Sequence, residues 1–470
     1  MSEQKQKENK SYINRYDTVV AFLSLELIAL TLFGLGGTTG LSILQIVAIF
    51  VALLAFPFIR NNFQGNFKKE ALLSLIPLGV LLALLAFGPF WSKAYYGGKA
   101  FSIILYGALV LFGGLAMFVV GYATSHNKAV KPKYLILAIL GGLALYVLIS
   151  GVYSLVRYGP FYASRYSGMV YYYEGVVFPI SNESKALIGF EFKETSIAFA
   201  KVASTILACS GIGLLGISPK KDKKMFIVVA ALALLGIIDL ILVPYKRGLY
   251  IVLIVYVIMG LAFLLHYLAG KSEDKKKLID KILKIAFFVF IGLVVLGVLA
   301  FVIDARTGFI RKMNIPKISS SLSNDNSILG TIRVSIEAAL FNGNSGGSQR
   351  FSFISFMFGC TPSNIITSPF FEFDVLWQTG FVGFAALLMV IFQAIANSKR
   401  FLSSHPMNYG YRMVIVSLLL GGFLVFSLSN DESPLVYSNV FMPLSRNAAP
   451  FALIYLCGVV SAHPSQEVAQ

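Results

Sequence analysis

The chain has 470 residues, of which 57% are hydrophobic and only 13% are charged. A soluble domain of this size has too little interior to hide so much apolar surface, so the composition excludes an ordinary globular enzyme and indicates a polytopic membrane protein. The formal net charge of +17 does not indicate binding to nucleic acid, because most basic residues lie in short segments between apolar stretches.

Apolar stretches long enough to cross a bilayer, about 20 residues each, recur along the whole chain. They predict an all-α polytopic bundle of about twelve transmembrane helices. The expected spans are 17–36, 40–59, 70–91, 100–123, 134–156, 195–217, 225–244, 248–269, 283–303, 373–396, 411–429 and 441–461. The chain then divides into a tail at 1–16, nine spans within 17–303, a large loop at 304–371, three spans within 372–461 and a second tail at 462–470.

Lysine and arginine set the expected orientation, because they are retained on the cytoplasmic side of short loops. With the first tail in the cytoplasm, clusters such as Lys220, Lys221, Lys223 and Lys224 all fall on that side, as do both chain ends. Cys209, Cys360 and Cys457 lie far apart without a metal-binding or disulfide spacing, so they are expected to fill apolar space.

Two of the expected outer loops are long, at 157–194 and 304–371, and long loops in membrane proteins are usually functional or disordered. Within the second loop, apolar residues recur at helical spacing over 328–340, and an apolar QRFSFISFMFG follows at 349–359. We therefore expect an ordered outer subdomain that rests on the membrane.

Basic residues at the outer surface are the candidate ligands for an anion. Lys246 and Arg247 sit at a tight outer turn, and Arg333 and Arg350 lie in the large loop. Arginine suits phosphate because its planar guanidinium group binds two oxygens at once and keeps its charge. Contacts with lipid headgroups explain the turn cations equally well, and solvated surface charge explains the loop arginines.

Two carboxylates, Glu372 and Asp374, stand at the start of the tenth expected span. All four histidines fall on the cytoplasmic side of the expected topology, so a general base at the outer face must be a carboxylate. Residues two apart point to different faces of a helix, so only one of the two acids is expected to be catalytic. The alternative is that both acids merely favour the positive end of a helix dipole. Glu26 and Asp239, inside spans, are expected to make structural pairs.

Three local motifs give the chain a resemblance to the bacterial O-antigen ligase and Wzy-type polysaccharide polymerase superfamily. PYKRGLYIVLIVYVIMG resembles its arginine-glycine turn and assigns that role to Arg247. GTIRVSIEAALF with the later FMFGC matches its outer-loop arginine and glycine at Arg333 and Gly359, with Arg350 as a rival alignment. FFEFDVLWQTGFVGF resembles its acid-bearing segment with a following G-x-x-G, at Gly380 and Gly383.

The resemblance implies a GT-C-like glycosyltransferase of the bacterial cytoplasmic membrane that needs no metal or other cofactor. It would transfer a glycan from an undecaprenyl-pyrophosphate donor to a sugar hydroxyl of a growing polysaccharide, with inversion. Candidate partners are membrane lipids, a flippase and a chain-length regulator, but no nucleic acid. Tyr171, Tyr172 and Tyr173 would stack on sugar rings or form an interfacial aromatic belt.

Ligases of this superfamily typically carry a histidine near the position of Ser368 or Pro369, and its absence here favours a polymerase over a ligase. A flippase for lipid-linked glycans is a third reading, since it would also have about twelve spans. A transporter of that kind is expected to show paired broken helices and charges near the middle of the membrane, whereas this chain gathers its charges outside.

Overall fold

The computed structural model describes residues 69–91, 100–126, 203–242, 246–269, 328–341, 351–359, 371–405, 407–428 and 449–462. It also describes parts of 132–148 and 277–303, and residues 186–187 and 190–191. The expected spans at 17–36 and 40–59 lie outside the described residues. Within the described part, helices dominate, and a hairpin of two short strands, β1 (Ala186–Leu187) and β2 (Phe190–Glu191), interrupts them.

Seven of the expected spans correspond to helices in the described residues. They are α3 (Lys69–Trp91), α4 (Ala100–His126), α9 (Lys223–Leu242), α10 (Lys246–Ala269), α16 (Phe371–Ser404), α17 (Tyr409–Leu428) and α19 (Ala449–Ser461). Most of their ends lie within about three residues of the expected ones, whereas α16 ends and α19 begins eight residues later than expected. Each helix is apolar around most of its circumference, as expected where a helix must satisfy its own backbone without water. The expected span at 195–217 differs, because it ends in a 3-10 helix, η1 (Ser210–Leu215).

Three of these helices are long and apolar enough to cross a membrane: Lys223–Leu242, Arg247–Leu268 and Val375–Ser404. Many of their large apolar side chains are exposed, among them Leu253, Ile258 and Met389. Water would penalise such exposure, whereas lipid does not. The structure is therefore that of a membrane protein.

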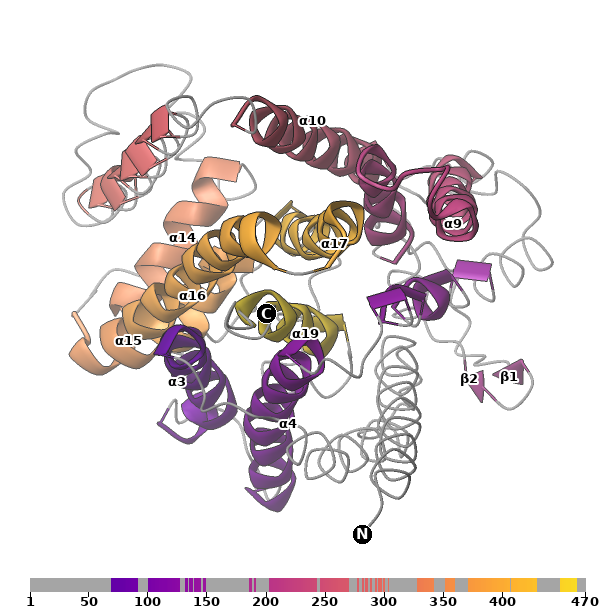
Figure 1. The fold of residues 1–470 in the computed structure, drawn as a ribbon. Helices are drawn as coiled ribbons and strands as arrows, with labels where there is room; N and C mark the ends of the chain where they lie inside the picture. Colours follow the sequence, from indigo (N-terminus) through magenta and orange to yellow (C-terminus); the bar gives the residue numbers. More distant parts are fainter. Residues whose placement is uncertain are drawn as a thin grey trace, which may run out of the picture.

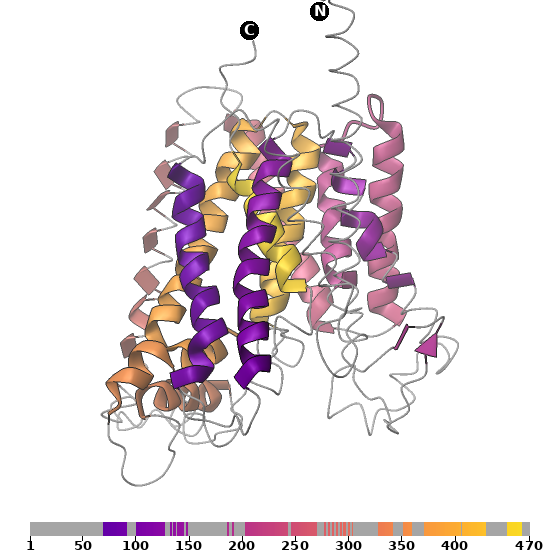
Figure 2. The same ribbon diagram turned by 90° about the horizontal axis from the view of Figure 1, so that it is seen from below.

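The helices stand side by side as a bundle (Figure 1), and Figure 2 shows the same helices from the side. Helix α4 packs closely against α19, where a Cβ on Gly121 would meet the carbonyl oxygen of Tyr455 at 2.1 Å. Asn397 of α16 ties three helices together, because its side-chain amide donates to Ser74 of α3 and to Ser461 of α19 at 2.9 Å each. Cys209 and Cys457 are buried, as expected of apolar fillers.

The large loop contains two helices in its described part, α14 (Ile328–Phe341) and α15 (Phe353–Phe358). The first confirms the helix expected at 328–340. Both pack on the first turns of α16, where Ile332 and Ile336 of α14 form one apolar cluster with Leu376 and Trp377. Figure 1 shows α14 and α15 beside α16, and Figure 2 shows that they lie at one end of the bundle. The described part of the loop is thus an ordered unit fixed to a membrane helix.

Candidate functional site

Glu372 lies in the first turn of α16, three residues before the membrane span that begins at Val375. Its side chain is half-buried. The hydroxyl group of Ser427, near the end of α17, donates a hydrogen bond to its Oε1 at 2.5 Å. The backbone of the second expected acid, Asp374, is in the same helix. The structure thus joins a predicted acid to a hydroxyl that no sequence motif singled out.

Burial changes the acidity of Glu372. Loss of hydration penalises the ionised form and raises the pKa of this carboxyl from its ordinary 4.5 to about 7, although the hydrogen bond from Ser427 acts in the opposite direction. A carboxyl group with this pKa is both partly ionised and a competent proton acceptor near neutral pH. Glu372 therefore has the properties that a general base needs.

Arg333 lies on α14 and faces Glu337 one turn later, with its Nε 3.9 Å from a carboxylate oxygen. Both side chains are largely buried, with 13% and 18% of their surface exposed. The neighbouring Ile332 and Ile336 pack on α16. The arginine is therefore held on an ordered helix and partly neutralised by its own acid.

Lys246 and Arg247 lie in the first turn of α10 rather than in the connection before it, because α9 ends at Leu242 and α10 begins at Lys246. The Arg247 side chain is exposed. At the far end of α10, His266 stacks on Tyr409 at the start of α17, with ring centroids 4.2 Å apart. The two helices run in opposite directions, so Arg247 and Ser427 belong to the same end of the bundle.

Glu372, Arg333 and Arg247 therefore share one end of the structure, but their known contacts go to different partners. Glu372 meets Ser427, Arg333 meets Glu337, and Arg247 lies exposed on α10. Their convergence on a single pocket stays a prediction. Arg350, Tyr171, Tyr172 and Tyr173 lie outside the described residues. Asp239, expected in a structural pair, accepts a hydrogen bond from Ser204.

The backbones of α15 and α16 cross closely beside this end. Gly380 breaks α16, with φ 67° and ψ −171°, and Gly359 ends α15 with φ 89° and ψ 172°. This region of backbone space is essentially restricted to glycine. A Cβ on Gly380 would meet the backbone of Met357 at 2.4 Å, and one on Gly359 would meet the Gln378 carbonyl oxygen at 2.1 Å. The sequence singled out both glycines but did not predict that the backbones of α15 and α16 cross at them.

Two polar side-chain atoms are buried near this crossing without a hydrogen-bond partner, Ser355 Oγ on α15 and Gln378 Nε2 on α16. Buried polar groups usually have a partner, which is often an ordered water. Within the residues that the structure describes, no three histidine, cysteine or acidic side chains are grouped as a metal site would require.

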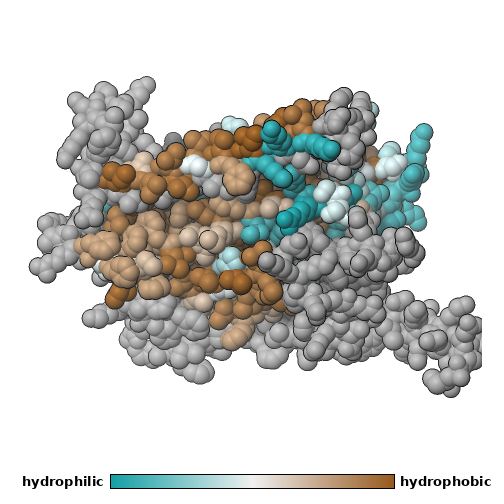
Figure 3. Space-filling view, turned by 60° about the vertical axis from the view of Figure 1, so that its left-hand side comes forward, coloured by the Kyte–Doolittle hydropathy of each residue, from teal (hydrophilic) through white to brown (hydrophobic). Residues whose placement is uncertain are grey.

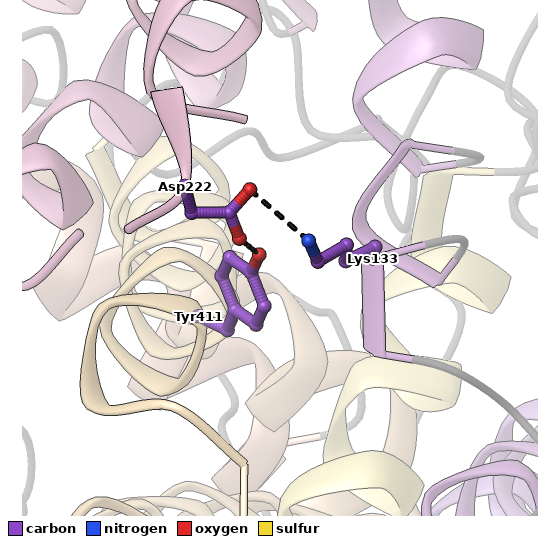
Figure 4. A network of polar contacts seen from close by, with 3 residues as sticks. All are labelled: Lys133, Asp222 and Tyr411. Atoms are coloured by element: carbon purple, nitrogen blue, oxygen red, sulfur yellow. Dashed lines mark hydrogen bonds and ion pairs between the residues drawn. The ribbon is translucent and has the colours of Figure 1, made fainter. Parts of the chain in front are cut away.

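A second polar cluster occupies the opposite end of the bundle (Figure 4). Asp222, just before α9, accepts a hydrogen bond from Tyr411 of α17 and forms an ion pair with Lys133, whose Nζ is 3.1 Å from Oδ1. The tyrosine and lysine lower the pKa of the Asp222 carboxyl. The sequence-based topology placed Lys133 at the cytoplasmic end. It did not predict that Asp222 would contact Lys133 and Tyr411, because these residues are 89 and 189 positions away from it in the chain.

Histidines also gather at this second end. His405 is buried, and its Nε2 lies 3.3 Å from the hydroxyl of Ser125 at the end of α4. Arg412 lies over the ring of Tyr409, 5.2 Å from its centroid, on the same tyrosine that stacks on His266. These histidines are therefore at the end away from Glu372, in agreement with the sequence-based placement.

Comparison with models of known protein families gives no match. Comparison with the sequences of characterised proteins also gives none.

Proposed function

We propose that this protein is a bacterial surface polysaccharide polymerase. It transfers a glycan from an undecaprenyl-pyrophosphate donor to a sugar hydroxyl at the outer face of the cytoplasmic membrane. The observation that carries the proposal is Glu372, a half-buried carboxyl at the start of a membrane helix whose pKa is raised to about 7. The motif resemblance supplies the reaction, and the environment of Glu372 supports its role as the base.

In the proposed reaction, Glu372 accepts the proton of the acceptor hydroxyl as that oxygen bonds to the anomeric carbon of the donor sugar. The bond between this carbon and the pyrophosphate oxygen breaks, and the lipid pyrophosphate leaves with the electron pair. Attack from the face opposite the leaving group inverts the anomeric centre. Holding both substrates in one place lowers the entropic part of the barrier.

Cationic side chains would stabilise the charge that develops on the leaving pyrophosphate. Arg247, Lys246, Arg333 and Arg350 are the proposed contacts. Of these, Arg333 already has an acidic neighbour at 3.9 Å, so phosphate would have to compete with Glu337 for the guanidinium group. Arg247 is exposed and is the more accessible of the two. Tyr171, Tyr172 and Tyr173 are the proposed glycan contacts, and neither metal nor other cofactor takes part.

The proposed setting is a GT-C-like bundle of about twelve spans with both termini in the cytoplasm. The supporting observations are the three helices able to cross a membrane and the ordered loop unit beside Glu372. Membrane lipids, the lipid-linked donor and the growing polysaccharide are the proposed partners, together with a flippase and a chain-length regulator.

The test uses the purified protein in lipid vesicles that carry a lipid-linked repeat unit. A ladder of longer glycans is expected, and Glu372→Gln should abolish it while the protein still inserts. Glutamine is matched in size but accepts no proton at neutral pH. A wild-type protein that leaves glycan length unchanged would overturn the proposal.

A flippase for lipid-linked glycans is the second candidate, because α16 is broken at Gly380 inside its membrane span. Discontinuous membrane helices are typical of transporters. The same vesicles separate the two functions: a flippase moves the glycan across the bilayer without changing its length.

A further inference from the structure

We infer that α15 lies in the membrane interface and that Phe351, Phe353 and Ile354 contact lipid. This lipid belongs to the leaflet nearest to Glu372. The inference does not depend on the catalytic proposal, because it rests on where the helix is held and on which of its faces is exposed.

The position of α15 along α16 follows from the crossing of their backbones. Met357, Phe358 and Gly359 touch the backbone around Gln378 and Gly380. Gly380 belongs to Val375–Ser404, the part of α16 that is long and apolar enough to cross a membrane. The C-terminal end of α15 is therefore held against this candidate span and not against the residues before it.

Contacts with α14 and α16 hold α15 in place. Its N-cap Ser352 donates its backbone N–H to the Leu340 carbonyl oxygen at the end of α14, at 3.1 Å. On its inner side, the Phe356 ring packs against that of Phe381 with centroids 4.5 Å apart. Helix α14 is itself packed on Trp377 and Phe384 of the span. The loop unit thus packs as one body on the candidate span of α16.

The outer face of α15 is apolar and uncovered. Phe353 and Ile354 are 63% and 60% exposed, whereas the next residue, Ser355, is only 2% exposed. Phe351 is also more than half exposed. Exposed aromatic and aliphatic side chains on a short helix are typical of segments that lie in the bilayer interface.

Lipid is the occupant that fits, because this face continues the apolar surface of the bundle. Met389 and Ile395 of the α16 span are likewise exposed and apolar. Figure 3 shows the molecule from the side on which α14, α15 and α16 lie, and apolar residues form a broad field there, with hydrophilic residues gathered toward one end. A soluble partner would have to compete with lipid for this face, because α15 packs on the candidate span of α16.

The test is the accessibility of nitroxide labels in vesicles of phosphatidylethanolamine and phosphatidylglycerol. Single cysteines replace Phe353 and Ile354 in a Cys360→Ser background, in which Cys209 and Cys457 are buried. Leu253→Cys, on the exposed face of the α10 span, gives the lipid reference, and Lys221→Cys, exposed before α9, gives the aqueous reference. Ser355→Cys is the matched buried control on α15.

Labels at 353 and 354 are expected to collide often with oxygen and rarely with a water-soluble nickel chelate, as at 253. Frequent collision with nickel, as at 221, would place the face in water and overturn the inference. Rare collision with both reagents, as at 355, would also overturn it, because a protein surface would then cover the face. Two neighbouring positions guard against a local effect of either label.

Discussion

Glu372 differs from an ordinary surface acid because its protonation responds to pH close to neutrality. Burial opposes ionisation, and the Ser427 hydroxyl partly compensates by donating to the carboxylate. A carboxyl of this kind loses its proton-accepting form when the pH falls below its raised pKa. The pH–rate profile of the proposed activity must therefore have an acidic limb, in which the rate falls as the pH is lowered.

We expect the initial rate of glycan elongation to fall as the pH drops below about 7, because Glu372 becomes protonated there. Glu372→Gln should lower the rate by about 100-fold or more above pH 7, the usual contribution of a general base, and the difference should shrink at lower pH, where Glu372 is protonated in the wild type. The measurement is the rate of ladder formation in vesicles as a function of pH.

Ser427 provides the matched test of a positioning role. Ser427→Ala removes the hydrogen bond that favours the ionised carboxylate, so the acidic limb should move to higher pH while the rate on the alkaline side is retained. Ser427→Thr keeps a hydroxyl and should restore the original limb. An unchanged limb in Ser427→Ala would show that this contact does not tune Glu372.

At the scale of the elements, α16 combines a regular membrane helix with a break that only glycine permits. The break at Gly380 and the end of α15 at Gly359 bring two backbones into direct contact. This contact fixes the loop unit to the span. A side chain at either glycine would force the two segments apart.

Gly380→Ala is therefore expected to lower the free energy of unfolding by about 3 kcal/mol, the combined order of a backbone conformation restricted to glycine and an overpacked contact. Gly260→Ala is the matched control, because Gly260 lies within α10 and a Cβ there meets nothing within 4 Å. Thermal unfolding of both variants in detergent provides the comparison. Equal melting temperatures for the two would contradict the role of the crossing.

At the scale of the whole molecule, polar contacts at the end opposite Glu372 hold distant parts of the chain together. Asp222 connects the segment before α9 to α17 and to Lys133. Asp222 is mostly buried, whereas the Lys133 side chain is 52% exposed. Exposed ion pairs contribute little, because water and salt screen them. The hydrogen bond from Tyr411 should therefore be the stronger of the two links.

A double-mutant cycle tests this ranking. Asp222→Asn, Tyr411→Phe and Lys133→Ala are combined in pairs, and the free energy of unfolding is measured in detergent. The coupling of Asp222 with Tyr411 should be about 1.5 kcal/mol or more, as for hydrogen bonds to charged groups, and that with Lys133 below about 1 kcal/mol and weaker in salt. Because the pKa of Asp222 is lowered in the folded protein, both couplings should be lost as the pH falls below its ordinary value of 3.8. A larger coupling with Lys133 would reverse the ranking.

The local sequence was enough to predict most of what is helical. The ends of α3, α4, α10 and α14 agree with their predicted ends to within about three residues, because helix formation and apolar length depend on neighbouring residues. The same reasoning placed Glu372 at the start of a helix and His266 and His405 at the other end. It did not predict the 3-10 helix η1, whose formation depends on packing against α9 and α17.

By itself, the sequence determined the class of the protein and the position of its acids and cations along the helices. Apolar length and charge placement are read from adjacent residues, and a membrane leaves helices as the natural way to satisfy the backbone. Only the tertiary structure decided that Ser427 meets Glu372, that Tyr411 meets Asp222, and that Gly359 packs against the backbone of Gln378 and Thr379. Those pairings join different helices, and their choice depends on how whole apolar faces pack, which no local pattern encodes.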